Sequence, residues 1–455
     1  MMTYMEKMIT TPCGNVRGTV ENGVMCFKGI HYAHAERWGY PTVVENWEGT
    51  VDATEYGDSC YQPRAFADES KDPDKLFYFR EFREGCNFTY SEDCLVLNIW
   101  APENAKDCPV LFYIHGGGFK SGSADEIEFD GPVWPEYGVI AVTINYRLGP
   151  MGFMALPELE AEAGSAGNYA RLGQVAAMQW VKNNISAFGG DPENVTIMGQ
   201  SAGAMSVQQH LLSPMTEGLF NRAILSSGGG VSEFLSAMPA KMSYPLCEKV
   251  MKAAGCSNLA EFRAVEPAKI FEAWAEVLKS DPKAAFAMSP VIDGRYIVGT
   301  GVDLVKAGKS KNVDVMLGTT SEDMMAPMLF QMAFGYAKSI AAMNDRKTYM
   351  WFFDRQLPGD DVGAWHSSDL WYWFGTLGKS WRPMVKRDYD LSREMVSYLM
   401  NFVKTGNPNG EGLEEWKTVD PASNALMRFG EKPAHMDEVD PASLKVRPKM
   451  PGMPD

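Results

Sequence analysis

The chain has 455 residues, more than the ~250 to 300 at which one hydrophobic core usually stops growing, so we expect several domains or one large sheet with insertions. Hydrophobic residues make up 45% and aromatic residues 12%, which is typical of a folded globular protein and excludes a disordered chain. The formal net charge of -16 repels phosphate backbones and anionic lipid surfaces, which argues against nucleic-acid and membrane partners.

The N-terminal segment lacks the features of a secretory signal. Glu6 and Lys7 interrupt residues 1–11 and leave no continuous apolar stretch, so we expect a cytoplasmic protein. No segment reaches the ~18 uninterrupted apolar residues of a membrane-spanning helix. None of the eight cysteines lies in a C-x-x-C pair, and the sequence therefore predicts no zinc site and no redox dithiol.

Short apolar runs alternate with glycine-rich or polar breaks in the first half of the chain. This alternation indicates an α/β fold with a central, mostly parallel sheet flanked by helices. Buried strands are predicted at residues 96–100, 110–114, 139–145 and 195–198. Between the last two, apolar residues recur at steps of three and four over residues 168–188, which predicts a helix.

Beyond Pro214 the sequence becomes rich in Met, Phe and Trp at helical spacing, with one further strand predicted at residues 313–317. We expect one domain over residues 1–455, with helical insertions over the site at residues 215–310 and 324–390. The tail contains Pro433, Pro441, Pro448, Pro451 and Pro454 and is expected to be irregular.

A G-x-S-x-G motif at residues 199–203 directly follows the strand predicted at 195–198 and precedes a helical run. This strand-turn-helix context is the one in which a nucleophilic serine is raised above a sheet. Gly199 and Gly203 are small enough for so sharp a turn, where a Cβ would strike a neighbouring element. Ser201 is therefore the predicted nucleophile.

An H-G-G-G run at residues 115–118 follows another predicted strand. Residues without a Cβ let backbone N–H groups approach a reacting carbonyl, so Gly117, Gly118 and Ala202 are predicted to form an oxyanion hole. Each such donor is worth on the order of 3 kcal/mol at the transition state. The spacing of a phosphate-binding loop is absent from the sequence. Acyl transfer of this kind requires no metal and no organic cofactor.

The predicted general base follows from the order of the residues along the chain. In a site of this type the serine comes first, then the acid, then the histidine. Of the six histidines, three precede Ser201, His210 lies on the helix leading away from it, and His435 lies in the tail. The remaining one, His366, is the predicted base.

The acid is expected in the loop after the strand predicted at residues 313–317. Glu322 and Asp323 both lie there, and either carboxylate suits the task of holding the imidazole in one tautomer. The spacing of the residues does not separate the two, and both stay candidates at this point.

Further segments give the chain a resemblance to the type-B carboxylesterases, the family that includes liver-type carboxylesterases and cholinesterases. Beside the two glycine motifs, the matching segments are F-K-G-I-H-Y-A (27–33), S-E-D-C-L-V-L-N (91–98), F-G-G-D-P-E-N-V-T (188–196) and T-G-N-P-N (405–409). The resemblance implies the α/β-hydrolase fold and hydrolysis of carboxylic esters through an acyl-enzyme. Counted from Gly318, the family's acid position is Asp323, and its histidine segment matches at His366 and Asp369.

The chain departs from the family at several positions. Asp323 stands where Glu is usual, so Glu322 is kept as the alternative acid. Gln200 stands where cholinesterases carry a Glu, which removes a negative charge that favours cationic substrates, and a choline ester is not expected. Cys60 and Cys94 match a pair that is disulfide-bonded in secreted relatives, but a cytoplasm would keep them reduced.

Apolar residues near the predicted site are candidates for a substrate pocket with adaptable walls. The candidates are Phe119, Met324, Phe330, Trp365 and Trp371. The same residues are equally suited to the core. The expected partner is a small-molecule ester with a short-chain or aromatic group, and the sequence does not choose between a monomer and a homodimer. Two alternatives stay open: a catalytically inactive binding member of the family, and a lipase that acts at interfaces.

Overall fold

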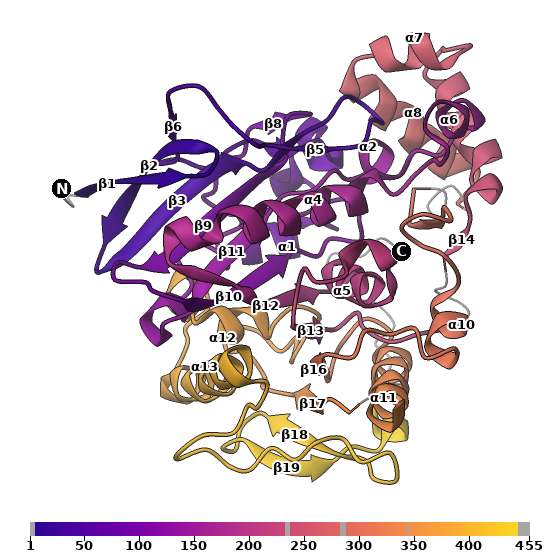
Figure 1. The fold of residues 1–455 in the computed structure, drawn as a ribbon. Coiled ribbons are helices and arrows are strands. Elements are labelled where there is room, and N and C mark those ends of the chain that lie inside the picture. Colours follow the sequence, from indigo (N-terminus) through magenta and orange to yellow (C-terminus); the bar gives the residue numbers. More distant parts are fainter. Residues whose placement is uncertain (1–4, 233–236, 283–287, 344, 445–455) are drawn as a thin grey trace.

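A mixed sheet runs through the computed structural model, which describes residues 5–232, 237–282, 288–343 and 345–444. From one edge to the other its strands are β1 (Met5–Thr11), β2 (Gly14–Glu21), β3 (Val24–His31), β9 (Val96–Pro102), β11 (Ile140–Ile144), β10 (Cys108–Ile114), β12 (Gly190–Gln200), β13 (Arg222–Ser226), β16 (Asp314–Thr320), β17 (Thr348–Phe353), β18 (Ala425–Phe429) and β19 (His435–Glu438). The short β6 (Thr50–Asp52) pairs with β2 outside this order. Figure 1 shows the sheet crossing the molecule from β1 to β19.

The middle of the sheet is parallel. Neighbouring strands from β11 to β18 run in the same direction, whereas β9 is antiparallel to β11 and β19 is antiparallel to β18. The carboxyl ends of parallel strands meet at one edge of a sheet. The loops after β10, β12 and β16 therefore lie at the same edge, and these loops carry the glycine run, Ser201 and the acidic pair.

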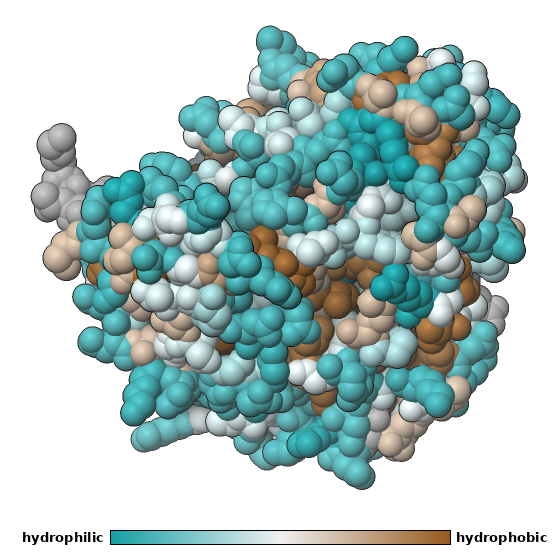
Figure 2. Space-filling model, turned by 45° about the horizontal axis from the view of Figure 1, so that its top comes forward, coloured by the Kyte–Doolittle hydropathy of each residue, from teal (hydrophilic) through white to brown (hydrophobic). Residues whose placement is uncertain are grey.

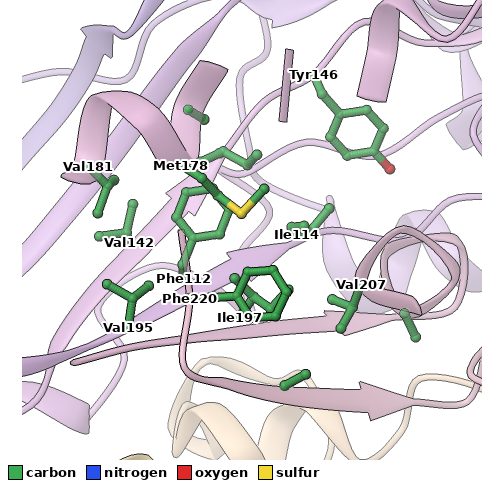
Figure 3. Packing of buried hydrophobic residues seen from close by; sticks show 14 of the residues in the cluster. Phe112, Ile114, Val142, Tyr146, Met178, Val181, Val195, Ile197, Val207 and Phe220 are labelled. Atoms are coloured by element: carbon green, nitrogen blue, oxygen red, sulfur yellow. The ribbon is translucent and has the colours of Figure 1, made fainter. Parts of the chain in front are cut away.

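Helices cover both faces of the sheet (Figure 1). Residues of α4 (Tyr169–Asn184), α5 (Ala202–Leu212) and α11 (Ala326–Met343) share a buried cluster with Phe112 and Ile114, and residues of α12 (Leu370–Phe374) and α13 (Lys386–Thr405) share another with Tyr113. Successive residues of a strand point to opposite faces, so β10 contributes to both clusters. In Figure 3, Met178 of α4 lies over Phe112 and Ile197. Burial of each such side chain stabilises the fold by about 1.5 to 3 kcal/mol.

A separate helical cap lies at one corner of the molecule (Figure 1). It consists of α6 (Tyr244–Ala253), α7 (Leu259–Ala264) and α8 (Pro267–Ser280), which bury their apolar faces against α2 (Gly149–Phe153) and α3 (Pro157–Ala163). The shorter α10 (Gly301–Lys306) follows. The remaining short strands form two-residue pairs: β4 (Ala33–His34) with β5 (Thr42–Val43), β7 (Ser59–Cys60) with β8 (Tyr90–Ser91), and β14 (Met238–Pro239) with β15 (Val291–Ile292).

The five predicted strands and the predicted helix are confirmed as β9, β10, β11, β12, β16 and α4. The predicted helical insertions are wrong in extent, because residues 215–310 include β13 and residues 324–390 include β17, both of which pair inside the main sheet. β17 reads T-Y-M-W-F-F and is buried throughout. A strand buried on both faces does not alternate, so such a run resembles a segment of a buried helix.

The predicted irregular tail is also wrong in part, because β19 at residues 435–438 pairs antiparallel with β18, and a short 3-10 helix follows at Pro441–Ser443. Pro448, Pro451 and Pro454 lie outside the described residues.

Cys60 and Cys94 form a disulfide with a Cα–Cα distance of 5.0 Å. The expectation of reduced thiols is therefore wrong for this structure. The bridge closes a loop that contains α1 (Leu76–Phe82) and joins its ends where β7 pairs with β8.

Figure 2 shows a face covered mostly by hydrophilic residues, with hydrophobic residues gathered near its centre. No helix within the described ranges is long and apolar enough to cross a bilayer.

Candidate active site

Ser201 occupies the bend between β12, which ends at Gln200, and α5, which begins at Ala202. Its φ of 56° and ψ of -124° lie where residues with a side chain are rarely found, and such strain is kept where the surroundings enforce it. The backbone N–H of Ser201 donates to the carbonyl of Ser226 in β13 at 2.8 Å. The predicted strand-turn-helix bend is therefore present, with a partly exposed serine at its tip.

Three glycines let the neighbouring segments close around this bend. A Cβ on Gly199 would lie 2.3 Å from the backbone of Gly203, and one on Gly203 would lie 2.0 Å from the carbonyl oxygen of Ile114. A Cβ on Gly228, in the loop after β13, would lie 2.1 Å from the carbonyl oxygen of Ser201. No larger residue fits at these positions without moving backbone.

His366 and Asp323 come together from the loops that follow β17 and β16. His366 Nδ1 donates to Asp323 Oδ1 at 2.5 Å, and the two side chains are only 5% and 0% exposed. The backbone N–H groups of Thr320 and Met324 also donate to Asp323, at 3.2 and 2.8 Å. Because Nδ1 donates to the carboxylate, the lone pair of the neutral ring lies on Nε2, on the side away from Asp323.

Glu322 forms its hydrogen bonds with Ser321 and Ala364 and not with the imidazole. Its Oε2 accepts hydrogen bonds from the N–H of Ala364 at 2.9 Å and from the hydroxyl of Ser321, and its own N–H donates to the carbonyl of Ala364 at 3.1 Å. These bonds tie the acid loop to the segment that precedes His366. Of the two predicted acids, Asp323 is the one that contacts the imidazole.

Gln200, the residue before the serine, contacts the other nitrogen of the same ring. Its Nε2 lies 3.2 Å from Nε2 of His366, and the amide therefore donates to the imidazole lone pair. Ser201 and His366, both in the described part of the chain, are not hydrogen-bonded to each other here. In this structure the Gln200 amide therefore occupies the lone pair of His366 Nε2.

The glycine run forms a tight loop whose peptide planes are fixed. His115 Nδ1 lies 2.9 Å from the carbonyl oxygen of Gly116, and the carbonyl of Gly117 accepts from the N–H groups of Lys120 and Ser121 at 3.1 and 3.0 Å. In a trans peptide the N–H points opposite to the C=O. The N–H groups of Gly117 and Gly118 therefore point away from these partners. Ala202, the first residue of α5, likewise has an N–H without an intrahelical acceptor.

The predicted pocket residues lie mostly in the core. Phe330, Trp365 and Trp371 are 0% exposed, and Phe119 is 5% exposed. Trp365 and Trp371 pack against Phe82 of α1, Phe330 packs against Phe334 and Phe352, and Phe119 packs against Phe153. Met324 is partly buried against the core. These four aromatic side chains thus contact other side chains rather than open space.

Within the described ranges, no group of three or more His, Cys, Asp or Glu side chains is arranged to hold a metal ion.

A second buried carboxylate, Asp369, lies close to the pair formed by His366 and Asp323. Its Oδ2 accepts hydrogen bonds from the hydroxyl of Ser226 at 3.0 Å and from Nε1 of Trp373 at 3.1 Å. Burial raises the pKa of Asp369 to about 6, partly offset by these two donors, and the charge of Asp323 raises it further. The sequence motif had marked Asp369, but nothing in the sequence connected it to Ser226.

This raised pKa predicts a pH-dependent stability. The unfolded chain ionises Asp369 near pH 3.8 and the folded chain near pH 6, so the contribution of Asp369 to stability falls as the pH rises from about 4 to 6 and is constant above that. Two pKa units correspond to about 3 kcal/mol. Urea unfolding of the wild type and of Asp369→Asn from pH 4 to pH 8 measures this effect. As the pH rises, the free energy of unfolding of the variant should increase by up to that amount relative to the wild type. A difference that does not change with pH would contradict the assignment.

The chain matches the profile of the Carboxylesterase family over residues 5–334 and 323–446. This chain belongs to the carboxylesterase family of hydrolases. It is 33% identical over 473 residues to a relative named para-nitrobenzyl esterase from Bacillus subtilis (strain 168), covering 90% of this chain and 92% of that protein.

A second member of the family is the cholinesterase of Mus musculus, which is 32% identical over 405 residues. The alignment covers 85% of this chain but only 64% of the mouse protein, so this chain spans less than two thirds of that relative. A solved structure of a PNB esterase superposes with a TM-score of 0.83 at 27% identity, covering 95% of this chain and 97% of that chain. The predicted α/β-hydrolase fold is thereby confirmed.

Proposed function

We propose that this protein is a serine carboxylesterase that cleaves carboxylic esters through an acyl-enzyme on Ser201. The 2.5 Å hydrogen bond between His366 and Asp323 carries the proposal, because it leaves the lone pair of the imidazole on Nε2, the atom that accepts the proton of Ser201 once the Gln200 amide has turned aside. The glycine loop after β10 lies at the same edge of the sheet. Nucleophile, base, acid and backbone donors are the four components that acyl transfer requires.

Acylation begins when His366 Nε2 accepts the proton of Ser201 as its oxygen attacks the ester carbonyl. Asp323 holds the ring and stabilises the imidazolium that forms. The N–H groups of Gly117, Gly118 and Ala202 donate to the oxyanion of the tetrahedral intermediate. His366 then protonates the leaving alcohol, and the acyl group stays on Ser201.

Deacylation repeats these steps with water as the nucleophile. His366 takes a proton from a water molecule that attacks the acyl carbonyl, and returns it to Ser201 as the acid leaves. Each step moves protons and an acyl group only, so the proposed reaction uses no redox or metal chemistry.

Neutral esters with a short acyl or aromatic group are the proposed substrates. Gln200 carries no charge beside the nucleophile, so a cationic alcohol gains no attraction from this position. A cavity of about 60 Å³ is lined by Met205, Leu212 and Gly228, and Gly228 touches the backbone of Ser201. Its small size favours short groups. The name of the relative para-nitrobenzyl esterase suggests aromatic esters as a first panel.

A fluorophosphonate probe tests this function directly, since it reacts with serines activated in this way. Wild-type protein should be labelled stoichiometrically and lose activity on p-nitrophenyl acetate, whereas Ser201→Ala should not be labelled. Folded wild-type protein that takes up no label would favour a non-catalytic binding protein. A rate that rises abruptly above the aggregation concentration of a long-chain ester would instead favour an interfacial lipase.

A further inference from the structure

The far end of the glycine loop is held by a side chain from another part of the chain. Gly122 has a φ of 110°, and a Cβ there would lie 2.3 Å from Nδ1 of His115 and 2.7 Å from the carbonyl oxygen of Gly116. The loop therefore folds back until Gly122 touches the residues that begin it. The position of Gly122 limits where the His115 ring and the Gly116 carbonyl can lie.

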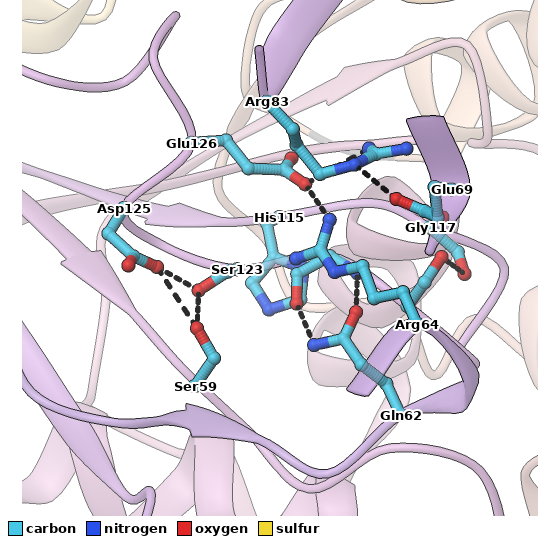
Figure 4. Close-up of polar contacts among 12 residues, drawn as sticks. Ser59, Gln62, Arg64, Glu69, Arg83, His115, Gly117, Ser123, Asp125 and Glu126 are labelled. Atoms are coloured by element: carbon cyan, nitrogen blue, oxygen red, sulfur yellow. Dashed lines mark hydrogen bonds and ion pairs between the residues drawn. The ribbon is translucent and has the colours of Figure 1, made fainter. Parts of the chain in front are cut away.

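The side chain of Gln62 forms hydrogen bonds with both the N–H and the carbonyl of Gly122. Its Oε1 accepts from the N–H of Gly122 at 3.0 Å, and its Nε2 donates to the carbonyl of Gly122 at 3.1 Å and to the carbonyl of Cys60 at 3.0 Å. The residue is 0% exposed. A buried amide with these bonds has one preferred orientation, since a flipped amide would place donors against donors. Figure 4 shows Gln62 beside His115 and the glycine loop.

A hydrogen bond from His115 to Gly116 connects the Gly122 contact to the N–H of Gly117, a predicted oxyanion donor. Since the acceptor is a carbonyl, His115 Nδ1 carries the proton and donates to Gly116. Burial lowers the pKa of His115 to about 4, so the ring stays neutral and keeps this arrangement at neutral pH. The Gly116 carbonyl belongs to the peptide whose N–H is that of Gly117. A contact that fixes the direction of the Gly116 carbonyl therefore also fixes the direction of the Gly117 N–H.

We infer that Gln62 is a positioning residue for the oxyanion hole: by clamping Gly122 against His115, it holds the Gly116–Gly117 peptide so that the N–H of Gly117 faces the reacting carbonyl. The inference rests on the proposed esterase function. The hydrogen bonds described for the Gln62 side chain go to Cys60 and Gly122 and not to Ser201.

The groups around Gln62 are themselves bonded to neighbours. The carbonyl of Cys60 that Gln62 binds belongs to the disulfide-bonded pair. Two charged groups drawn in the same view, Arg64 and Glu126, are bonded to each other at 2.7 Å (Figure 4), and both side chains are under 10% exposed. Asp125 accepts from Ser59 at 3.3 Å and from Ser123. These charges therefore have partners of their own.

Two substitutions separate positioning from packing. Gln62→Met keeps the length and removes all three hydrogen bonds. Gln62→Glu keeps the shape, and in this buried place its carboxyl is neutral at low pH, where it both donates and accepts. Gln179→Leu is the matched control, because Gln179 bonds only to Asn183 along the surface of α4 among the described contacts.

We expect Gln62→Met to lower kcat by about 10- to 100-fold on p-nitrophenyl acetate with KM changed less than threefold, since a misplaced oxyanion donor weakens only the transition state. The Ki of a trifluoromethyl ketone, which forms a tetrahedral adduct with the serine, should rise by the same factor. For Gln62→Glu, the measured quantity is the ratio of its kcat to that of the wild type at the same pH. This ratio should be near one at low pH and should fall toward the value for Gln62→Met as the pH rises. Gln179→Leu should equal the wild type throughout.

The inference is overturned if folded Gln62→Met keeps the kcat and the ketone affinity of the wild type, or if KM rises while kcat stays unchanged. Should Gln62→Met fail to fold, a pH-independent ratio for Gln62→Glu overturns it as well. Failure of the esterase function would appear differently, as wild-type protein that neither hydrolyses the ester nor binds the ketone.

Discussion

Replacing Ser201 with alanine is expected to lower kcat by about 10⁶-fold, to the residual level that backbone donors and binding supply. The variant loses the oxygen that forms the acyl bond, and no other hydroxyl lies on the bend. Alanine keeps the Cβ, so the strained φ of 56° costs about as much in the variant as in the wild type, and stability should change little. Initial rates on p-nitrophenyl acetate and thermal unfolding measure the two effects.

His366→Ala provides the control for Ser201→Ala. Since the two residues act in one step, the double variant should be no slower than either single variant. Losses that multiply in the double variant would contradict a shared step. Ser201→Ala with more than about one hundredth of the wild-type rate would contradict the proposed nucleophile.

Asp323→Asn is expected to lower kcat by about 10⁴-fold. The asparagine amide would direct a donor at Nδ1 of His366, which favours the tautomer that carries its proton on Nε2. The ring then has no lone pair facing Ser201. The 2.5 Å bond to a side chain that is 0% exposed leaves the imidazole no alternative partner for Nδ1 from solvent. The kcat on p-nitrophenyl acetate, compared with that of the wild type at the same pH, measures this effect.

Glu322→Gln is the matched comparison, because it makes the same chemical change in the neighbouring residue. Oε2 of Glu322 accepts both from the Ala364 N–H and from Ser321, and the oxygen of a glutamine amide in the same place can keep both bonds. We expect a loss of less than tenfold. A larger loss for Glu322→Gln than for Asp323→Asn would reverse the assignment of the acid.

Local sequence determined those parts of the fold and of the site that depend on neighbours along the chain. The bend at Ser201 needs glycine at positions 199 and 203, and both are written in the motif together with the strand before it. The strands at 96–100, 110–114, 139–145 and 195–198 were predicted because short apolar runs ended at turn residues. Chain order selected His366 from six histidines. The strands and the bend follow from periodicity and residue size, which a single segment carries by itself.

Tertiary structure alone decided the contacts between segments that are distant in the sequence. Glu322 and Asp323 are adjacent and chemically similar, and only the direction of each side chain assigns one to His366 and the other to Ala364. Trp365 and Trp371, two of the residues predicted for a pocket, lie in the core because Phe82 of α1 packs against them. β17 lies between β16 and β18, and its apolar run is buried on both faces of the sheet. Pairing, side-chain direction and burial depend on what the rest of the chain places alongside a segment, and no local pattern specifies that.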